Sequence, residues 1–280
     1  MDQVPVVALN AAAAPRTLDV LFVQLAPCTH VRANVEVACR LLDDHPGADL
    51  AVFSELYLQS YAQKGIEPLD ATASRGPVAA LRDAARRNGT SVVLGAAIRE
   101  PSGMANAALC IDRAGETVAI YRKVHLFGAE TRYFSPGEEY VVATLSGLAA
   151  GVLIWYDLDF PEAARTVAAA GAQLLVTTSA NMDPYAPDHA LYTRARALEN
   201  RAPHVYVNAV GREGRLRFCG GSAAVDSSGF PIAKLPAYEP AVRLVSVPLH
   251  HWPTDPRPEY LAARRSDVVA RAVGRSVPVR

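Results

Sequence analysis

Three segments of the sequence place ionisable side chains where apolar stretches of strand length end. The apolar run 50–53 is followed closely by Glu55, and the run 121–130 (YRKVHLFGAE) carries Lys123 and Glu130. The third segment, 151–162 (GVLIWYDLDFPE), predicts a buried strand, a sharp elbow and a helix with a proline in its first turn. Pockets in α/β folds open at the carboxyl ends of strands, so we expect these side chains to meet there.

The residue types indicate acid–base chemistry without an obvious nucleophile. A carboxylate such as Glu55 can act as a general base, and two carboxylates around a lysine can exchange protons. A strand-to-helix elbow exposes the residue that ends the strand, which here is Trp155. An indole offers one N–H donor and no usable lone pair, so Trp155 cannot attack an electrophile.

Taken together, the three segments resemble the nitrilase (carbon–nitrogen hydrolase) superfamily, in particular its amidase-like branch. The family pattern has a glutamate after an early strand, a lysine in an RKxHLF-like loop and a cysteine in an elbow of the form GxxICYDxxFPE. Glu55 falls on the glutamate, Lys123 on the lysine and Trp155 on the cysteine, while Glu130 resembles the second carboxylate of the family. The resemblance covers about residues 19–267 and includes the segments 180–182, 196–200 and 219–222.

The resemblance implies a reaction that this chain cannot complete in the usual way. In the family, the glutamate takes the proton of the thiol, the cysteine attacks a nitrile or amide carbon, and the lysine stabilises the oxyanion. With Trp155 at the cysteine position, the covalent thioester route is closed. Cys219, Tyr156 and Asp157 are weaker candidates for a nucleophile, and a water molecule activated by Glu55 or Glu130 is a further hypothesis.

Two functions remain open from the sequence. In one, the Trp155 indole forms a wall that stacks on an aromatic or cationic substrate. The Glu55/Lys123/Glu130 cluster then performs noncovalent acid–base chemistry on a small amide-like C–N substrate, such as hydrolysis, cyclisation or dehydration. In the other, the indole plugs the site of a pseudoenzyme that binds a ligand or acts as a scaffold. Because burying three charges costs desolvation energy, their retention slightly favours the first function.

The pocket that either function needs is predicted to include four further side chains. These substrate-binding candidates are Tyr61, Tyr156, Asn181 and Tyr185. His125 is expected to brace its loop rather than to act as a catalyst.

Apolar periodicity predicts an α/β protein, and the resemblance specifies an α-β-β-α sandwich with mixed sheets and helices on the outer faces. Helices are expected at 31–44, 77–88, 161–170 and 189–200. Strands are expected at 19–25, 50–53, 91–98, 105–111, 117–122, 151–155 and 174–177, and near Val205, Ala223 and Val245. The three strands within 91–122 are expected to form an antiparallel meander, and the uncharged run 140–156 suits two strands around a turn.

Composition limits the setting and the partners. Lysine plus arginine equals aspartate plus glutamate at 28 each, so no global charge favours nucleic acid or a membrane surface. The four cysteines are scattered, which predicts neither disulfides nor a metal site and suits a reducing cytoplasm. We expect a flexible leader at 1–16, a single domain at 17–280 with an extended tail from about 252, and no cofactor. The expected partner is a small molecule, and the resemblance implies a homodimer or higher homo-oligomer.

Overall fold

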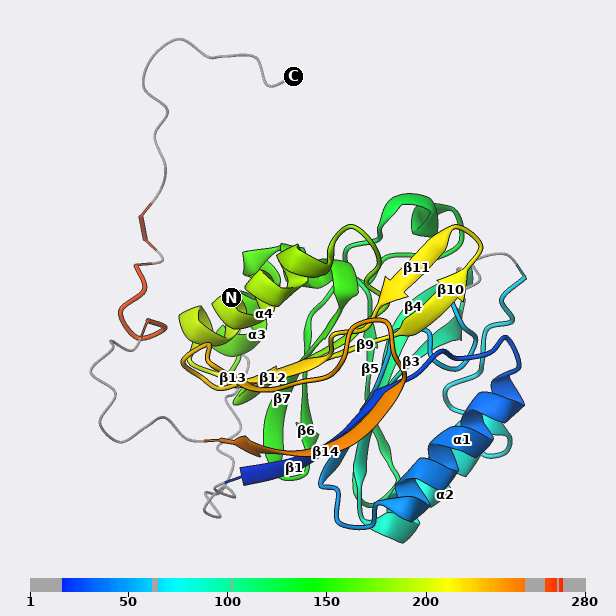
Figure 1. Ribbon diagram of the computed structural model, residues 1–280. Coiled ribbons are helices and arrows are strands. Elements are labelled where there is room, and N and C mark those ends of the chain that lie inside the picture. Colours follow the sequence, from blue (N-terminus) through cyan, green and yellow to red (C-terminus); the bar gives the residue numbers. More distant parts are fainter. Residues whose placement is uncertain (1–16, 62–64, 102, 250–259, 266, 269–280) are drawn as a thin grey trace.

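Two six-stranded mixed sheets form the centre of the computed structural model, which describes residues 17–61, 65–101, 103–249, 260–265 and 267–268 (Figure 1). The first sheet has the order β14-β1-β2-β3-β4-β5 and the second the order β13-β12-β9-β8-β7-β6. The strands of the first sheet are β1 (Thr17–Gln24), β2 (Leu50–Phe53), β3 (Ser91–Glu100), β4 (Gly103–Ile111), β5 (Thr117–Arg122) and β14 (Ala241–Pro248). Those of the second are β6 (Val141–Leu145), β7 (Leu148–Ile154), β8 (Leu174–Ser179), β9 (His204–Asn208), β12 (Ala223–Val225) and β13 (Pro231–Lys234).

Each sheet carries a pair of helices that connect its parallel strands. The helices α1 (Val31–Asp44) and α2 (Pro77–Asn88) link β1, β2 and β3, and the helices α3 (Pro161–Ala169) and α4 (Ala186–Asn200) link β7, β8 and β9. Figure 1 shows the two pairs on opposite outer sides of the sheets. The predicted α-β-β-α arrangement with mixed sheets is therefore confirmed.

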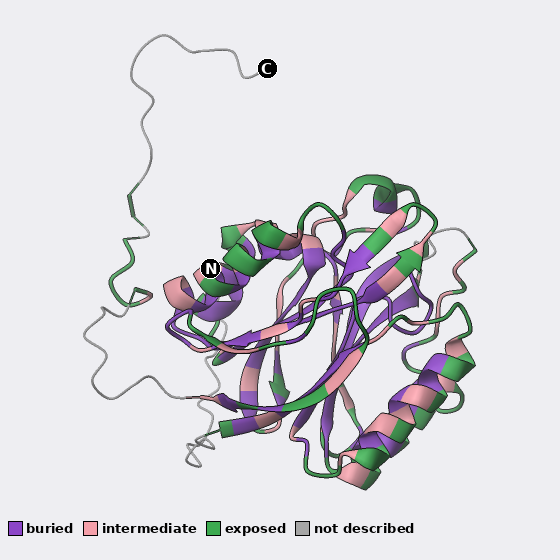
Figure 2. Cartoon of the chain, in the orientation of Figure 1, coloured by how far each residue is buried: buried purple, intermediate pink, exposed green. Residues whose placement is uncertain are grey.

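The alternation of side chains along the strands explains the layers. In β1, Val20 and Phe22 belong to the large cluster between the sheets, whereas Leu21 and Val23 belong to the cluster under α1 and α2. Because successive side chains of a strand point to opposite faces, a strand covered on both sides must be apolar throughout. Figure 2 shows the central strands as almost continuously buried.

Most predicted elements agree with the structure within a few residues. The bounds of α1, α2, β2 and β5 are those expected from the sequence, the meander β3-β4-β5 is antiparallel, and the run 140–156 contains the antiparallel pair β6 and β7. Helix α4 begins three residues before its predicted start, because Pro187 fits the first turn. The expected strand 151–155 ends at Ile154, and Trp155 already belongs to the following turn.

Three short strands were not predicted, because their sequences lack a clear apolar pattern. The hairpin β10 (Val210–Glu213) and β11 (Leu216–Cys219) and the strand β13 alternate weakly between apolar and polar residues. The leader predicted at 1–16 and most of the tail predicted from 252 lie outside the described residues. None of the helices in the described ranges combines the length and the apolar character that crossing a bilayer requires.

One glycine lets the segment that bears Glu55 lie flat against β3. The backbone N–H of Gly95 donates to the Ser54 carbonyl at 3.2 Å, and the Leu58 N–H donates to the Gly95 carbonyl at 3.2 Å. A Cβ atom on Gly95 would lie 2.4 Å from the Leu56 nitrogen and 2.5 Å from the Ser54 oxygen. Only glycine permits this approach of two backbones.

We predict that Gly95→Ala lowers the free energy of unfolding by at least about 2 kcal/mol, because the added methyl group forces the backbones apart. Gly47→Ala is the matched control, since a Cβ there meets nothing within 4 Å. Its effect should stay within about 0.5 kcal/mol. Urea denaturation of both variants checks this expectation, and equal midpoints would contradict it.

Candidate functional site

A buried lysine and two buried carboxylates meet where the two sheets come together. Glu55 follows β2, Lys123 follows β5, and Glu130 lies in the short 3-10 helix η1 (Gly128–Arg132). The Lys123 Nζ lies 2.7 Å from Glu55 Oε1 and 2.9 Å from each carboxylate oxygen of Glu130. All three side chains have no solvent exposure, so their charges interact in a low-dielectric environment.

Each carboxylate is held by further donors. Glu55 Oε1 accepts from Asn106 Nδ2 at 2.7 Å, and its Oε2 accepts from the Ala180 backbone N–H at 2.9 Å. Glu130 Oε1 accepts from the Tyr61 hydroxyl at 2.6 Å, while Oε2 accepts from the Phe127 N–H at 2.8 Å. Each of the four carboxylate oxygens of Glu55 and Glu130 therefore accepts from a donor other than Lys123. These hydrogen bonds fix the orientation of both side chains.

The pKa values of the cluster follow from two carboxylates sharing one cation. Burial raises the pKa of Glu55 to about 7, against the lowering effect of the Lys123 ammonium and with a further raising effect of Glu130. Burial alone would lower the pKa of Lys123, but the adjacent carboxylates of Glu55 and Glu130 raise it above its ordinary value. Lys123 is therefore charged near neutrality, and Glu55 is poised to gain or lose a proton.

The elbow after β7 places Trp155 beside this cluster. Trp155 opens the 3-10 helix η2 (Trp155–Asp159) and has a backbone φ of 31°, in the left-handed region. Asp157 fixes the turn, because its carboxylate accepts from the Ile154 N–H at 3.0 Å and from the Tyr121 hydroxyl at 2.7 Å. Such a backbone conformation is kept in non-glycine residues only when the surroundings enforce it.

The indole of Trp155 is enclosed on all sides. Its exposure is 2%, and the Lys123 Nζ lies 4.6 Å from the centroid of its ring. The Trp155 Nε1–H donates to Asn181 Oδ1 at 3.3 Å. The rings of Phe127 and Tyr61 approach edge-on, at 4.8 and 6.0 Å between centroids. The face of the indole is thus covered by the cation of Lys123 and by aromatic neighbours.

The cavity that touches the cluster is small. It has a volume of about 30 Å³ and is lined by Glu55, Ser60, Tyr61, Ala180 and Phe218 among others. A cavity of this size has room for about one or two water molecules. It is far below the several hundred Å³ of a typical small-molecule site.

The sequence-predicted pocket residues divide into two pairs. Tyr61 and Asn181 contact the centre directly, through Glu130 and the Trp155 indole respectively. Tyr156 and Tyr185 instead pack their rings against Phe127, at 5.1 and 5.9 Å between centroids.

His125 braces its loop as expected. Its N–H and Nδ1 lie 2.9 and 3.0 Å from Asp157 Oδ1, and its ring stacks on Phe160 at 3.7 Å between centroids.

Sequence reasoning missed Asn106. This residue is fully buried within β4 and orients Glu55 through its amide group. A polar residue inside the otherwise apolar stretch 104–111 (MANAALCI) was the available signal, since an asparagine in a central strand needs a partner.

Cys219 does not complete the cluster. Its Sγ donates to the Asn181 carbonyl oxygen at 3.2 Å and accepts from Asn208 Nδ2 at 3.3 Å. Burial raises the pKa of Cys219 to about 11, so the thiol is protonated and poorly nucleophilic near neutrality. Across the described ranges, no group of three or more His, Cys, Asp or Glu residues is arranged to hold a metal ion.

Comparison with known proteins finds one family. The carbon–nitrogen hydrolase family profile matches residues 22–256. The chain is 37% identical over 232 residues to a hydrolase encoded in the pqqF 5′ region of Pseudomonas protegens, covering 79% of this chain and 80% of that protein. It is 37% identical over 187 residues to an (R)-stereoselective amidase from a Pseudomonas species, covering 65% and 66% of the two chains.

Solved structures of an amidase from the same superfamily are also similar to this chain. A cysteine-to-alanine mutant of an amidase from Nesterenkonia AN1, of the nitrilase superfamily, superposes with a TM-score of 0.78 at 29% identity and covers 91% of this chain and 97% of that chain. A glutamate-to-glutamine mutant of the same amidase, with the acetamide moiety of fluoroacetamide added covalently at its active-site cysteine, has a TM-score of 0.77 at 30% identity, covering 91% and 97%.

The raised pKa of Glu55 predicts a pH dependence of stability. A carboxyl group that holds its proton more tightly when folded contributes stability below its ordinary pKa of 4.5, and this is lost as the pH rises through about 7. Relative to Glu55→Gln, the wild type should lose about 3 kcal/mol of unfolding free energy over this interval. Urea denaturation at a series of pH values measures the difference, and a difference that stays constant with pH would contradict the assignment.

Proposed function

The chain belongs to the carbon–nitrogen hydrolase family, and on that premise we propose that Trp155 stands at the position of the family's catalytic cysteine. A glutamate-to-glutamine mutant of the Nesterenkonia amidase carries the acetamide moiety of fluoroacetamide covalently at its active-site cysteine. In this chain, the elbow beside Glu55 and Lys123 carries an indole, which cannot form such an adduct. Thiol-dependent hydrolysis of amides or nitriles is thereby lost.

The observation that carries the proposal is the burial of the Trp155 indole at 2% exposure, directly over the Lys123 ammonium. A substrate carbonyl would need the space that the indole fills, next to a cation that would stabilise its oxyanion. An indole buries on the order of 200 Å² when it is enclosed, so its removal from this position would be costly. The enclosed geometry favours a plug over an aromatic wall that stacks on a substrate.

We therefore propose a pseudoenzyme that binds a ligand or acts as a scaffold. Glu55, Lys123 and Glu130 then serve as an ion network that joins β2, β5 and η1 beneath the indole. Such a network can be retained for stability alone. Replacing any one of the three residues would leave the others as unpaired buried charges, which is destabilising. A cytoplasmic location, a single domain and a homodimeric assembly remain predictions of the same proposal.

Trp155→Cys tests whether the plug alone abolishes the reaction. The change opens space and places a thiol near Glu55, which can take the thiol proton. We expect the resulting thiolate to displace fluoride from fluoroacetamide, so that one acetamide moiety is bonded to the introduced sulfur. The wild type should gain no adduct at this site. Intact mass spectrometry followed by peptide mapping measures both.

Trp155→Ala is the matched control, because it opens similar space without a thiol. A stoichiometric adduct on Cys219 in the wild type would contradict the proposal. A folded Trp155→Cys protein without any adduct would show that more of the site than residue 155 has changed.

A second candidate function rests on the small cavity against Glu55 and on the pKa of Glu55 of about 7. A water molecule there could lose a proton to Glu55 while its oxygen attacks an amide carbon. The Lys123 ammonium would then stabilise the oxyanion, and the proton on Glu55 would pass to the leaving amine. This mechanism needs the indole to swing away from the cluster, which is why it ranks second.

If this second function operates, ammonia release from small amides should rise with pH through about 7 as Glu55 ionises. Glu55→Gln should then reduce the rate by about 10²- to 10⁴-fold, the range for loss of a general base. Glu213→Gln, which alters a different carboxylate at the rim of the same cavity, is the matched control. Equal rates for Glu55→Gln and wild type would reject the water mechanism.

A further inference from the structure

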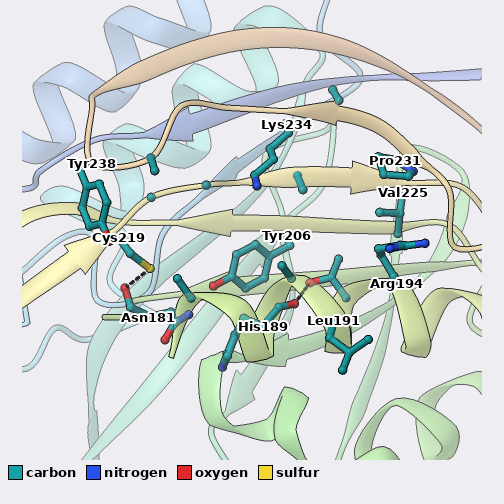
Figure 3. Close-up of a pocket in the computed structure, with 18 residues that line it drawn as sticks. Asn181, His189, Leu191, Arg194, Tyr206, Cys219, Val225, Pro231, Lys234 and Tyr238 are labelled. Atoms are coloured by element: carbon teal, nitrogen blue, oxygen red, sulfur yellow. Dashed lines mark hydrogen bonds between the residues drawn. The ribbon is translucent and has the colours of Figure 1, made fainter. Parts of the chain in front are cut away.

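A mostly apolar groove lies away from the charged cluster, between α4 and the strands β12 and β13. It has a volume of about 400 Å³, within the range of small-molecule sites. Figure 3 shows its two sides, with Leu191 and Arg194 on the helix and Val225, Pro231 and Lys234 on or beside the strands. Asn181 belongs both to the groove and to the surroundings of Trp155, but Glu55, Lys123 and Glu130 do not line the groove.

The walls of the groove are mostly apolar. Small side chains of α4, β12 and β13 line it, including Ala190, Ala223 and Ala233, together with Val225. The ring of Tyr206, at 4% exposure, forms part of its floor. An apolar ligand body would be removed from water along this length, which is the main source of affinity in such sites.

The charges that border the groove have one sign. Lys234 points from β13 toward the side that holds Tyr206, and Arg194 lies at the end near Val225 and Pro231 (Figure 3). Arg194 Nε donates to the Gly229 carbonyl oxygen at 2.9 Å, which fixes the side chain without neutralising it. Within the part of the chain that the structure describes, no aspartate or glutamate lines the groove, and neither cation forms an ion pair.

Asp183, which contacts the groove residue Tyr238, already has two partners. The Tyr238 hydroxyl, from a groove residue, donates to Asp183 Oδ1 at 2.8 Å, and Arg217 Nη1 lies 3.7 Å from Asp183 Oδ2. Two uncompensated cations over an apolar floor are complementary to an anion with an apolar body.

We propose that this groove binds a small carboxylate with an apolar chain or ring, whose carboxylate pairs with Lys234 and whose body lies along α4. This inference goes beyond the proposed function, because it concerns a different site and holds whether or not the charged cluster is active.

The groove is connected to the indole through hydrogen bonds. The Tyr206 hydroxyl lies 3.0 Å from Ser179 Oγ, which accepts from the Asn181 N–H at 3.1 Å. Asn181 lines the groove and also accepts the indole N–H of Trp155 at 3.3 Å. A ligand that shifts Tyr206 or Asn181 should therefore change the emission of Trp155.

The test uses octanoate as the probe and 1-octanol as its neutral counterpart. The full chain carries Trp252→Phe, so that Trp155 is the single tryptophan. Isothermal titration calorimetry measures affinity, and tryptophan emission reports the coupling. We expect octanoate to bind at one site with an affinity that falls as salt is raised, and 1-octanol to bind at least about 5-fold more weakly.

Lys234→Met should weaken octanoate binding by about 5- to 10-fold, because it removes the charge but keeps a similar apolar stem. Ala190→Phe, at an exposed position on α4 that borders the groove, should block binding without loss of the fold. Arg86→Met, which removes an exposed cation from α2 on the other sheet, is the matched control and should bind like the parent.

Equal affinity for octanoate and 1-octanol, or unchanged binding in Lys234→Met, would overturn the proposal. It would also be overturned if sedimentation showed a dimer that Ala190→Phe dissociates while neither form binds octanoate, because a second copy of the chain would then occupy the groove. These outcomes do not depend on adduct formation in Trp155→Cys, so each proposal can fail separately.

Discussion

The buried ammonium of Lys123 between Glu55 and Glu130 is the interaction on which the centre of the molecule depends. Three fully buried charges are tolerated only because each carboxylate oxygen has a donor at 2.6–2.9 Å. Those donors come from both sheets and from the loops between them. Asn106 lies in β4, whereas the Ala180 N–H follows β8, so satisfying the charges also fixes how the two sheets meet.

The burial of these charges explains why the Glu55/Lys123/Glu130 cluster and the Trp155 indole pack against each other. Lys123 faces the Trp155 ring at 4.6 Å, so the cation gains a partner on the side that the carboxylates leave open. Phe127 links the two parts, because its N–H donates to Glu130 and its ring packs on the indole. An ammonium in a dry pocket would otherwise require water or a substrate oxygen there. The Trp155 indole takes up that space instead.

The apolar groove beside α4 shares Asn181 with this unit but differs from it in chemistry. The centre holds a cation paired with two carboxylates and has little space, whereas the groove has space and two cations without an ion pair. Affinity for small molecules requires accessible apolar volume and a few convergent polar groups. In this fold, the surface beside α4 meets that requirement, whereas the small cavity against Glu55 does not.

The sequence by itself determined the layered α/β fold and the identity of the charged residues. Helices such as α1 and α2 were predictable to the residue, because apolar periodicity is a local signal. Helix α2 also has Pro77 in its first turn and Gly89 at its C-terminal cap. Glu55, Lys123 and Trp155 could be named because they follow recognisable strand ends in a family order. The role of Asn106 was not predicted, because its partner Glu55 is distant in sequence. The β10–β11 hairpin was not predicted either, because its apolar pattern is weak.

Only the tertiary structure shows how completely the Trp155 indole is enclosed. The sequence shows the size of an indole but not the volume around it. That volume depends on Phe127, Tyr61 and Asn181, which come from three separate segments. The groove beside α4 could not be predicted from the sequence either. Lys234 and Arg194 border one groove only because the fold brings β13 close to α4. Local periodicity specifies elements, whereas enclosed space is a property of their packing.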